Sequence, residues 1–92
     1  MKAVLLRIAG RVQGVGYRDS MVMAARQLGL VGWVRNRLDG TVEAYAAGAD
    51  QDIDSLIEWA RRGPPAARVT EVAVDAADAE SAPTSFERHR SA

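Results

Sequence analysis

Apolar and polar positions alternate along the first part of the chain and then change period. Within segment 2–9 the apolar residues Val4, Leu6 and Ile8 occupy every second position, which predicts a strand with one buried face. From about Arg18 the apolar residues instead recur every three or four positions, which predicts a helix. Gly29 follows the last of them and is the residue type that commonly ends helices. The residues of this helical stripe are Met21, Ala24, Ala25 and Leu28.

The middle of the chain predicts a β-hairpin followed by a second helix. Segments 30–37 and 41–46 have the composition of strands and flank Asp39-Gly40, a dipeptide typical of hairpin turns. Residues 50–62 form the second helical pattern, with acidic side chains at its start and arginines at its end, as the helix dipole favours. The apolar stripe of this helix consists of Ile53, Leu56, Ile57 and Ala60.

The last third of the chain predicts two strands separated by a loop. Residues 67–74 alternate as a strand does, residues 75–83 are polar and rich in alanine, and residues 85–90 form a short strand around Phe86. The resulting order, β-α-β-β-α-β, predicts an α+β fold, the ferredoxin-like α/β sandwich, with a four- to five-stranded antiparallel sheet and both helices on one face. We expect residues 1–92 to form a single domain.

The composition narrows the class of function. The 92 residues include twelve basic and twelve acidic side chains, so the net charge is zero, whereas a nucleic-acid binder normally has a basic excess. The chain contains no cysteine, which excludes disulfides and thiolate catalysis. No stretch approaches the ~20 apolar residues of a membrane span. We therefore expect a cytoplasmic monomer that binds neither nucleic acid nor a membrane.

The segment between the first strand and the first helix is rich in glycine. Gly10, Gly14 and Gly16 allow backbone conformations that turn successive N–H groups toward one point, an arrangement that binds anions. The N-terminus of the following helix adds unpaired N–H donors, and Arg18 adds a guanidinium that suits phosphate or carboxylate oxygens. The alternative is a tight strand-to-helix connection with Arg18 pointing to solvent. The glycine spacing alone does not decide between these two interpretations.

Asn36 is the second candidate site residue. It shares a predicted strand face with Gly32 and Val34, a place where asparagine is uncommon. Its amide can both donate and accept hydrogen bonds, so it could hold a water molecule or an oxyanion. The alternative is that Asn36 merely opens the hairpin turn.

The two candidate segments together resemble a known family. The sequence GRVQGVGYR over residues 10–18, followed by GWVRNRLDGTVE over residues 32–43, is similar to the two signature segments of the acylphosphatases. The segments LGLVGWV and GPPAARVTEV extend the resemblance to about Val74. The resemblance implies hydrolysis of the carboxyl-phosphate bond of small acyl phosphates to a carboxylate and inorganic phosphate, without metal or cofactor. It also implies the ferredoxin-like sandwich.

The same resemblance implies roles for individual residues. Arg18 corresponds to the phosphate-binding arginine, and Asn36 corresponds to the residue that positions the attacking water. The main chain before Arg18 corresponds to the phosphate cradle, which comprises Gln13, Gly14, Val15, Gly16 and Tyr17. An acyl phosphate suits a chain with so few catalytic side chains, because the conjugate acid of its leaving carboxylate has a pKa of roughly 4.

Two other functions stay open on the sequence. An anion-binding module would keep the cradle but release no product. An RNA-binding domain of the same topology is disfavoured by the zero net charge and by the lack of paired aromatic residues in the middle strands. We expect His89 to be a surface residue and not a catalytic base. Asp19 directly follows Arg18 and could either pair with it or repel an incoming anion.

Overall fold

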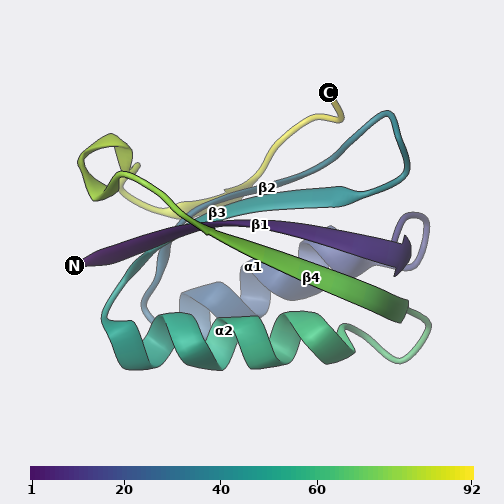
Figure 1. Cartoon of the computed structure of the whole chain (residues 1–92), viewed down its shortest axis with the longest axis horizontal. Coiled ribbons are helices and arrows are strands. Elements are labelled where there is room, and N and C mark those ends of the chain that lie inside the picture. Colours follow the sequence, from purple (N-terminus) through teal and green to yellow (C-terminus); the bar gives the residue numbers. More distant parts are fainter.

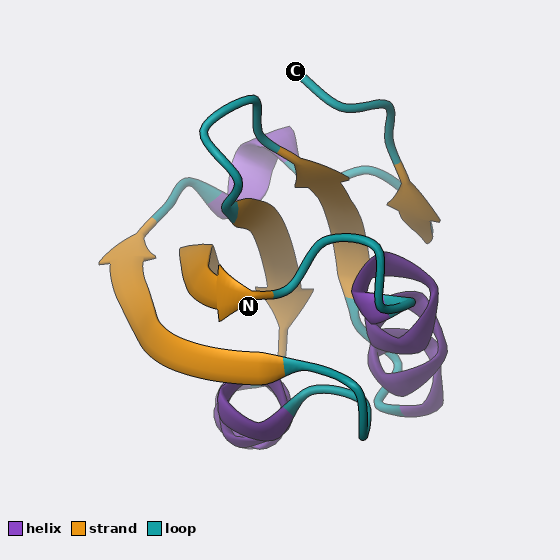
Figure 2. Ribbon diagram, turned by 90° about the vertical axis from the view of Figure 1, so that its right-hand side faces the viewer, coloured by secondary structure: helices purple, strands orange, loops and turns teal.

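One sheet of five strands carries both α-helices on the same face in the computed structural model, which describes all residues, 1–92 (Figure 1). Figure 2 shows the molecule turned by 90°, with the two helices lying along one side of a strongly twisted sheet. In chain order the elements are β1 (Lys2–Arg11), α1 (Tyr17–Gln27), β2 (Val31–Asn36), β3 (Val42–Gly48), α2 (Asp50–Arg62), β4 (Arg68–Ala76), the 3₁₀-helix η1 (Ala79–Ser81) and β5 (Phe86–Arg88).

The strands lie in the order β4-β1-β3-β2-β5. Neighbouring strands among the first four of this order are antiparallel, which confirms the ferredoxin-like fold predicted from the sequence. β5 pairs in parallel with β2, with Phe86 opposite Gly32. The prediction of an antiparallel sheet is therefore wrong for this edge strand, and the sheet is mixed.

The direction of β5 follows from the route of the chain before it. Residues 77–85 leave the end of β4 and cross the sheet face opposite to the helices, where η1 lies (Figure 1). Ala79 and Ala82 pack there against a small apolar cluster that contains Tyr45. The chain thus reaches the edge of the sheet beside the first residues of β2, where the Gly32 N–H donates to the Ser85 carbonyl. β5 consequently runs in the same direction as β2.

β4 continues to Ala76, past the end at Val74 that the sequence pattern predicts. The additional residues are held by β1, whose Val4 pairs with Ala76. The predicted loop 75–83 therefore begins later than expected, and it contains η1, which Asp78 caps by accepting a hydrogen bond from the Glu80 N–H.

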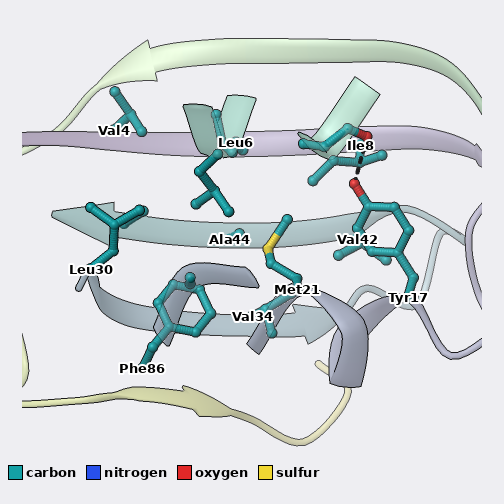
Figure 3. Close-up of a cluster of buried hydrophobic side chains, with 14 of the residues drawn as sticks. Val4, Leu6, Ile8, Tyr17, Met21, Leu30, Val34, Val42, Ala44 and Phe86 are labelled. Carbon is teal, nitrogen blue, oxygen red and sulfur yellow. Dashed lines mark hydrogen bonds between the residues drawn. The ribbon is translucent and has the colours of Figure 1, made fainter. Parts of the chain in front are cut away.

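The two layers enclose a core of sixteen buried side chains (Figure 3). The inward face of the sheet and the apolar stripes of both helices supply it, as the sequence periods predict. Val12 and Tyr17, at the two ends of the loop between β1 and α1, are both members of this core. The core therefore fixes both ends of that loop. No helix of the structure is both long and apolar enough to cross a membrane.

The residues after β5 continue alongside β2. The His89 N–H donates to the Val34 carbonyl at 2.8 Å, and the Ala92 N–H donates to the Asn36 carbonyl at 2.9 Å. The C-terminal segment therefore lies beside the end of β2, next to Asn36.

Candidate active site

Residues 12–16 connect β1 to α1 through a loop with two glycines in the left-handed conformation. The φ angle is 74° at Gly14 and 78° at Gly16, a region that costs most residues with a Cβ atom roughly 1–2 kcal/mol. A Cβ atom on either glycine would meet nothing within 4 Å. Glycine is thus required here by the backbone conformation and not by crowding, and the space above both residues is open.

The main-chain N–H groups of residues 13–19 donate no hydrogen bond within the protein. They belong to the loop and to the first turn of α1, whose N-cap residue Gly16 offers no side-chain cap. The first turn of α2 differs, because its Asp52 N–H donates to the Ala49 carbonyl at 3.0 Å. Seven consecutive free donors at the positive end of a helix dipole form a ready binding site for an anion.

A cavity of about 240 Å³ adjoins this loop. Five of the seven site residues predicted from the sequence line it, whereas Gln13 and Val15 do not. The structure therefore brings Arg18 and Asn36, which come from different elements, to one place. The full lining consists of Val12, Gly14, Gly16, Tyr17, Arg18, Asp19, Asn36 and Arg88.

The side chains of Gln13 and Val15 point elsewhere. The Gln13 Nε2 atom donates to the carbonyls of Arg37 and Thr41, at 2.8 Å and 2.9 Å, and so ties the loop to the β2–β3 hairpin. Val15 packs against the core. Any contact of these two residues with an anion is therefore confined to their main-chain N–H groups.

The Tyr17 side chain anchors the start of α1 in the core (Figure 3). Its hydroxyl donates a buried hydrogen bond of 2.8 Å to the Ala60 carbonyl, in the last turn of α2. In a continuing helix the N–H group four positions later would donate to this carbonyl, but that residue is Pro64, which has no N–H group. Burial raises the pKa of the Tyr17 phenol well above its ordinary value. The buried ring thus holds Tyr17 in place at the edge of the cavity.

Arg18 lies in the first turn of α1 and lines the cavity. The helix dipole disfavours a cation at this position, unless an anion completes the site. The Arg18 Nη1 atom donates to the His89 carbonyl at 3.3 Å, which connects the side chain to the C-terminal segment. The His89 ring itself stacks on Trp33, with ring centroids 5.6 Å apart, and does not line the cavity.

Asn36 ends β2, and its Oδ1 atom is buried without any hydrogen-bond partner. An unpaired buried acceptor costs about 1–3 kcal/mol, so this atom calls for a donor from the cavity, such as a water molecule. The neighbouring Arg35 and Arg37 both bind Glu43, at 2.7 Å and 3.5 Å, and neither lines the cavity. Both arginines therefore point away from Asn36, as the alternation of side chains along a strand requires.

Asp19 pairs with Arg88 of β5 and not with Arg18. The Arg88 Nη1 atom lies 3.0 Å from the Asp19 Oδ1 atom, and both residues line the cavity. Sequence patterns alone do not identify Arg88 as a site residue. The two partners are 69 positions apart, and no local pattern connects them. Only the parallel pairing of β5 with β2 brings Arg88 beside α1.

A family model described as Acylphosphatase matches residues 4–88, which include every residue of the cavity lining. The chain belongs to the acylphosphatase family. The resemblance seen in the two signature segments thus extends through all five strands and both helices.

Several acylphosphatases are similar to this chain over most of their length. The acylphosphatase of Acidovorax sp. (strain JS42) is 64% identical over 74 residues, which cover 80% of this chain and 76% of the relative. That of Thiobacillus denitrificans (strain ATCC 25259 / T1) is 48% identical over 88 residues, covering 96% and 97%. The crystal structure of acylphosphatase from Bacillus subtilis matches with a TM-score of 0.93 at 35% identity, covering 97% of this chain and 99% of that chain.

These acylphosphatase relatives confirm the activity expected from the sequence. The protein is a hydrolase that acts on small acyl phosphates and releases phosphate. The fold, the family and the reaction agree with one another. Membership of the acylphosphatase family therefore replaces both alternatives, an anion-binding module without turnover and an RNA-binding domain.

Proposed function

We propose that the phosphoryl group of the substrate binds at the N-terminus of α1, held by the main-chain N–H groups of residues 13–17 and by the Arg18 guanidinium. The observation that carries this proposal is the run of free N–H donors beside a cavity that Arg18 lines. Hydrogen bonds from such donors to phosphate oxygens are charge-assisted and about twice as strong as neutral ones. A bound dianion also offsets the unfavourable position of the Arg18 charge near the positive end of the helix.

Asn36 then positions the attacking water. Its unpaired Oδ1 atom accepts a hydrogen bond from one O–H of the water, which turns a lone pair of the water oxygen toward phosphorus. The water oxygen forms a bond to phosphorus while the bond between phosphorus and the acyl oxygen breaks. The electron pair of that bond leaves with the carboxylate. One proton of the water moves to a phosphoryl oxygen, so the products are a carboxylate and dihydrogen phosphate.

This reaction requires no acid for the leaving group. The departing carboxylate is stable at neutral pH, since its conjugate acid has a pKa of roughly 4. Phosphoryl transfer passes through a loose transition state, so positioning and charge stabilisation supply most of the rate enhancement. The free N–H groups and Arg18 stabilise the phosphoryl oxygens, and Asn36 supplies the positioning.

A titration with inorganic phosphate, followed through the backbone amide signals in NMR spectra, tests the binding site. We expect the largest shifts at residues 13–18, together with competitive inhibition of benzoyl phosphate hydrolysis by phosphate. We also expect that turnover is unchanged by a chelator, because no step uses a metal ion. Shifts centred on another part of the chain would contradict the proposed cradle.

We also propose that the enzyme acts as a single-domain monomer. The proposed site is complete within the chain, because the chain itself supplies the free N–H donors, Arg18 and Asn36, and sixteen side chains form its main core. Sedimentation equilibrium of the active enzyme tests this proposal. The cytoplasmic location stays a prediction.

A further inference from the structure

Arg88 reaches the cavity from a different element than Arg18 does. Arg18 belongs to the first turn of α1, whereas Arg88 is the last residue of the edge strand β5. Side chains alternate along a strand, so Arg88 lies on the same face as the buried Phe86 and is turned toward α1. The cavity therefore presents two guanidinium groups to a ligand.

The protein itself uses little of the hydrogen-bonding capacity of Arg88. The guanidinium has five N–H donors, and a single 3.0 Å bond to Asp19 is its only hydrogen bond to a protein acceptor. The Arg88 side chain is 50% exposed. Its remaining donors are available to a ligand in the cavity.

The acyl part of the substrate is the ligand group that these donors can meet. The free N–H groups and Arg18 already serve the phosphoryl group, and about 240 Å³ holds several water volumes of roughly 30 Å³ each, so room remains beside it. That room has little apolar surface. Val12 and Tyr17 are the hydrophobic residues of the lining, and both side chains are buried in the core. An alkyl or aryl group would therefore bury little apolar area there.

We propose that Arg88 recognises a carboxylate on the acyl part, so that the enzyme prefers short acyl phosphates derived from dicarboxylic acids. This inference depends on the proposed binding of the phosphoryl group at α1. A guanidinium matches a carboxylate with two parallel hydrogen bonds. Asp19 competes with the substrate carboxylate for Arg88 and repels it, so Asp19 lowers the preference.

The test compares succinyl phosphate with butyryl phosphate. Both acyl groups have four carbons. The succinyl group ends in a carboxylate, whereas the butyryl group ends in a methyl group. The measured quantity is the selectivity ratio, which is kcat/KM for succinyl phosphate divided by kcat/KM for butyryl phosphate. Arg88→Gln is expected to lower this ratio about fivefold, which is the effect expected for losing an ion pair that is half exposed to solvent. Asp19→Asn is expected to raise it.

A charge-matched double variant separates direct contact from general electrostatics. Asp19→Asn combined with Arg88→Gln leaves the net charge of the cavity lining as it is in the wild type. If Arg88 contacts the carboxylate, the double variant keeps a lowered selectivity ratio.

Arg90→Gln is the control, since Arg90 is exposed, does not line the cavity and makes no side-chain hydrogen bond. It is expected to leave the ratio at the wild-type value. Arg88→Lys serves in place of Arg88→Gln if the latter fails to fold, and it is expected to lower the ratio less.

Two results would overturn the inference. One is an equal fall of kcat/KM for both substrates in Arg88→Gln, and the other is a wild-type ratio in the double variant. Failure of the underlying site assignment has a different signature, because Arg18→Gln would then still hydrolyse butyryl phosphate. An unchanged ratio with an inactive Arg18→Gln enzyme would reject only the role of Arg88.

Discussion

Arg18, in the first turn of α1, and Asn36, the last residue of β2, line the same cavity. Their chemistry is different. The guanidinium of Arg18 can only donate hydrogen bonds and always carries a charge, whereas the buried Oδ1 atom of Asn36 can only accept. The first suits the charged oxygens of a phosphoryl group, and the second suits a neutral water. Substitutions at the two positions should therefore affect binding and turnover differently.

Replacing Arg18 by glutamine is expected to lower kcat/KM for benzoyl phosphate by at least about 100- to 1000-fold, the range for loss of one major electrostatic donor. Phosphate should also stop inhibiting the enzyme. The fold should be kept, because the single hydrogen bond of Arg18 to the His89 carbonyl is exposed. Arg11→Gln is the matched control, since Arg11 is exposed at the end of β1 and outside the cavity. Near-wild-type turnover of Arg18→Gln would remove this residue from the mechanism.

Replacing Asn36 by alanine is expected to lower kcat about 100-fold, the cost of a poorly placed reactant. The inhibition constant of phosphate should stay within about twofold of the wild type, because Asn36 positions the water and does not bind the phosphoryl group. The variant should be at least as stable as the wild type in urea, since the substitution removes a buried acceptor that has no partner. Equal losses of phosphate affinity and turnover would show that Asn36 binds phosphate instead of placing water.

The parts of the fold and site that the sequence predicts depend on local patterns. The period of apolar residues identifies both helices and the core strands, because one face of each element must be buried. Gly14 and Gly16, which adopt positive φ angles in the structure, mark the loop before Arg18 as unusual. Their spacing alone leaves the role of the loop open, and the resemblance to the acylphosphatases implies that role. Asn36 stands out because an amide is uncommon on a buried strand face.

The remaining features depend on contacts between distant segments, which local patterns do not encode. Asp19 can pair with Arg88 only because β5 runs parallel to β2. That direction in turn follows from residues 77–85, which cross the sheet face opposite to the helices. The Gln13 side chain similarly finds its partners, Arg37 and Thr41, on a hairpin more than 20 positions away. A glutamine in a loop gives no sign of that role.

The Gln13 side chain should stabilise the loop rather than bind substrate. Gln13→Ala is expected to lower the free energy of unfolding by about 1–2 kcal/mol, because two hydrogen bonds to hairpin carbonyls are lost. Gln13→Glu should lower it further at neutral pH, since a carboxylate cannot donate and would face the same two carbonyl oxygens. Urea unfolding measures both effects. Gln27→Ala is the control, as Gln27 is exposed at the end of α1. Equal stability of the alanine and glutamate variants would contradict this role.

The buried phenol of Tyr17 should make the stability of the enzyme depend on pH in the alkaline range. Burial raises its pKa in the folded state, while the unfolded chain titrates near the ordinary value of 10.0. Below that pH both states keep the proton, so the contribution of Tyr17 to stability is fully present. Above it the unfolded state loses the proton first, and stability falls by about 1.4 kcal/mol per pH unit.

Tyr17→Phe is therefore expected to show a shallower loss of stability above pH 10 than the wild type. Some slope should remain, because burial, and then the charge of Asp78, raise the pKa of Tyr45 as well. At neutral pH the variant should be less stable by about 1 kcal/mol, since the Ala60 carbonyl loses the phenol that satisfies it. Urea unfolding between pH 7 and pH 11, with Tyr45→Phe as the matched control, separates the two tyrosines. Identical alkaline slopes for wild type and Tyr17→Phe would contradict this prediction. They would mean that the phenol ionises as readily in the folded enzyme as in the unfolded chain, despite its burial and its hydrogen bond to the Ala60 carbonyl.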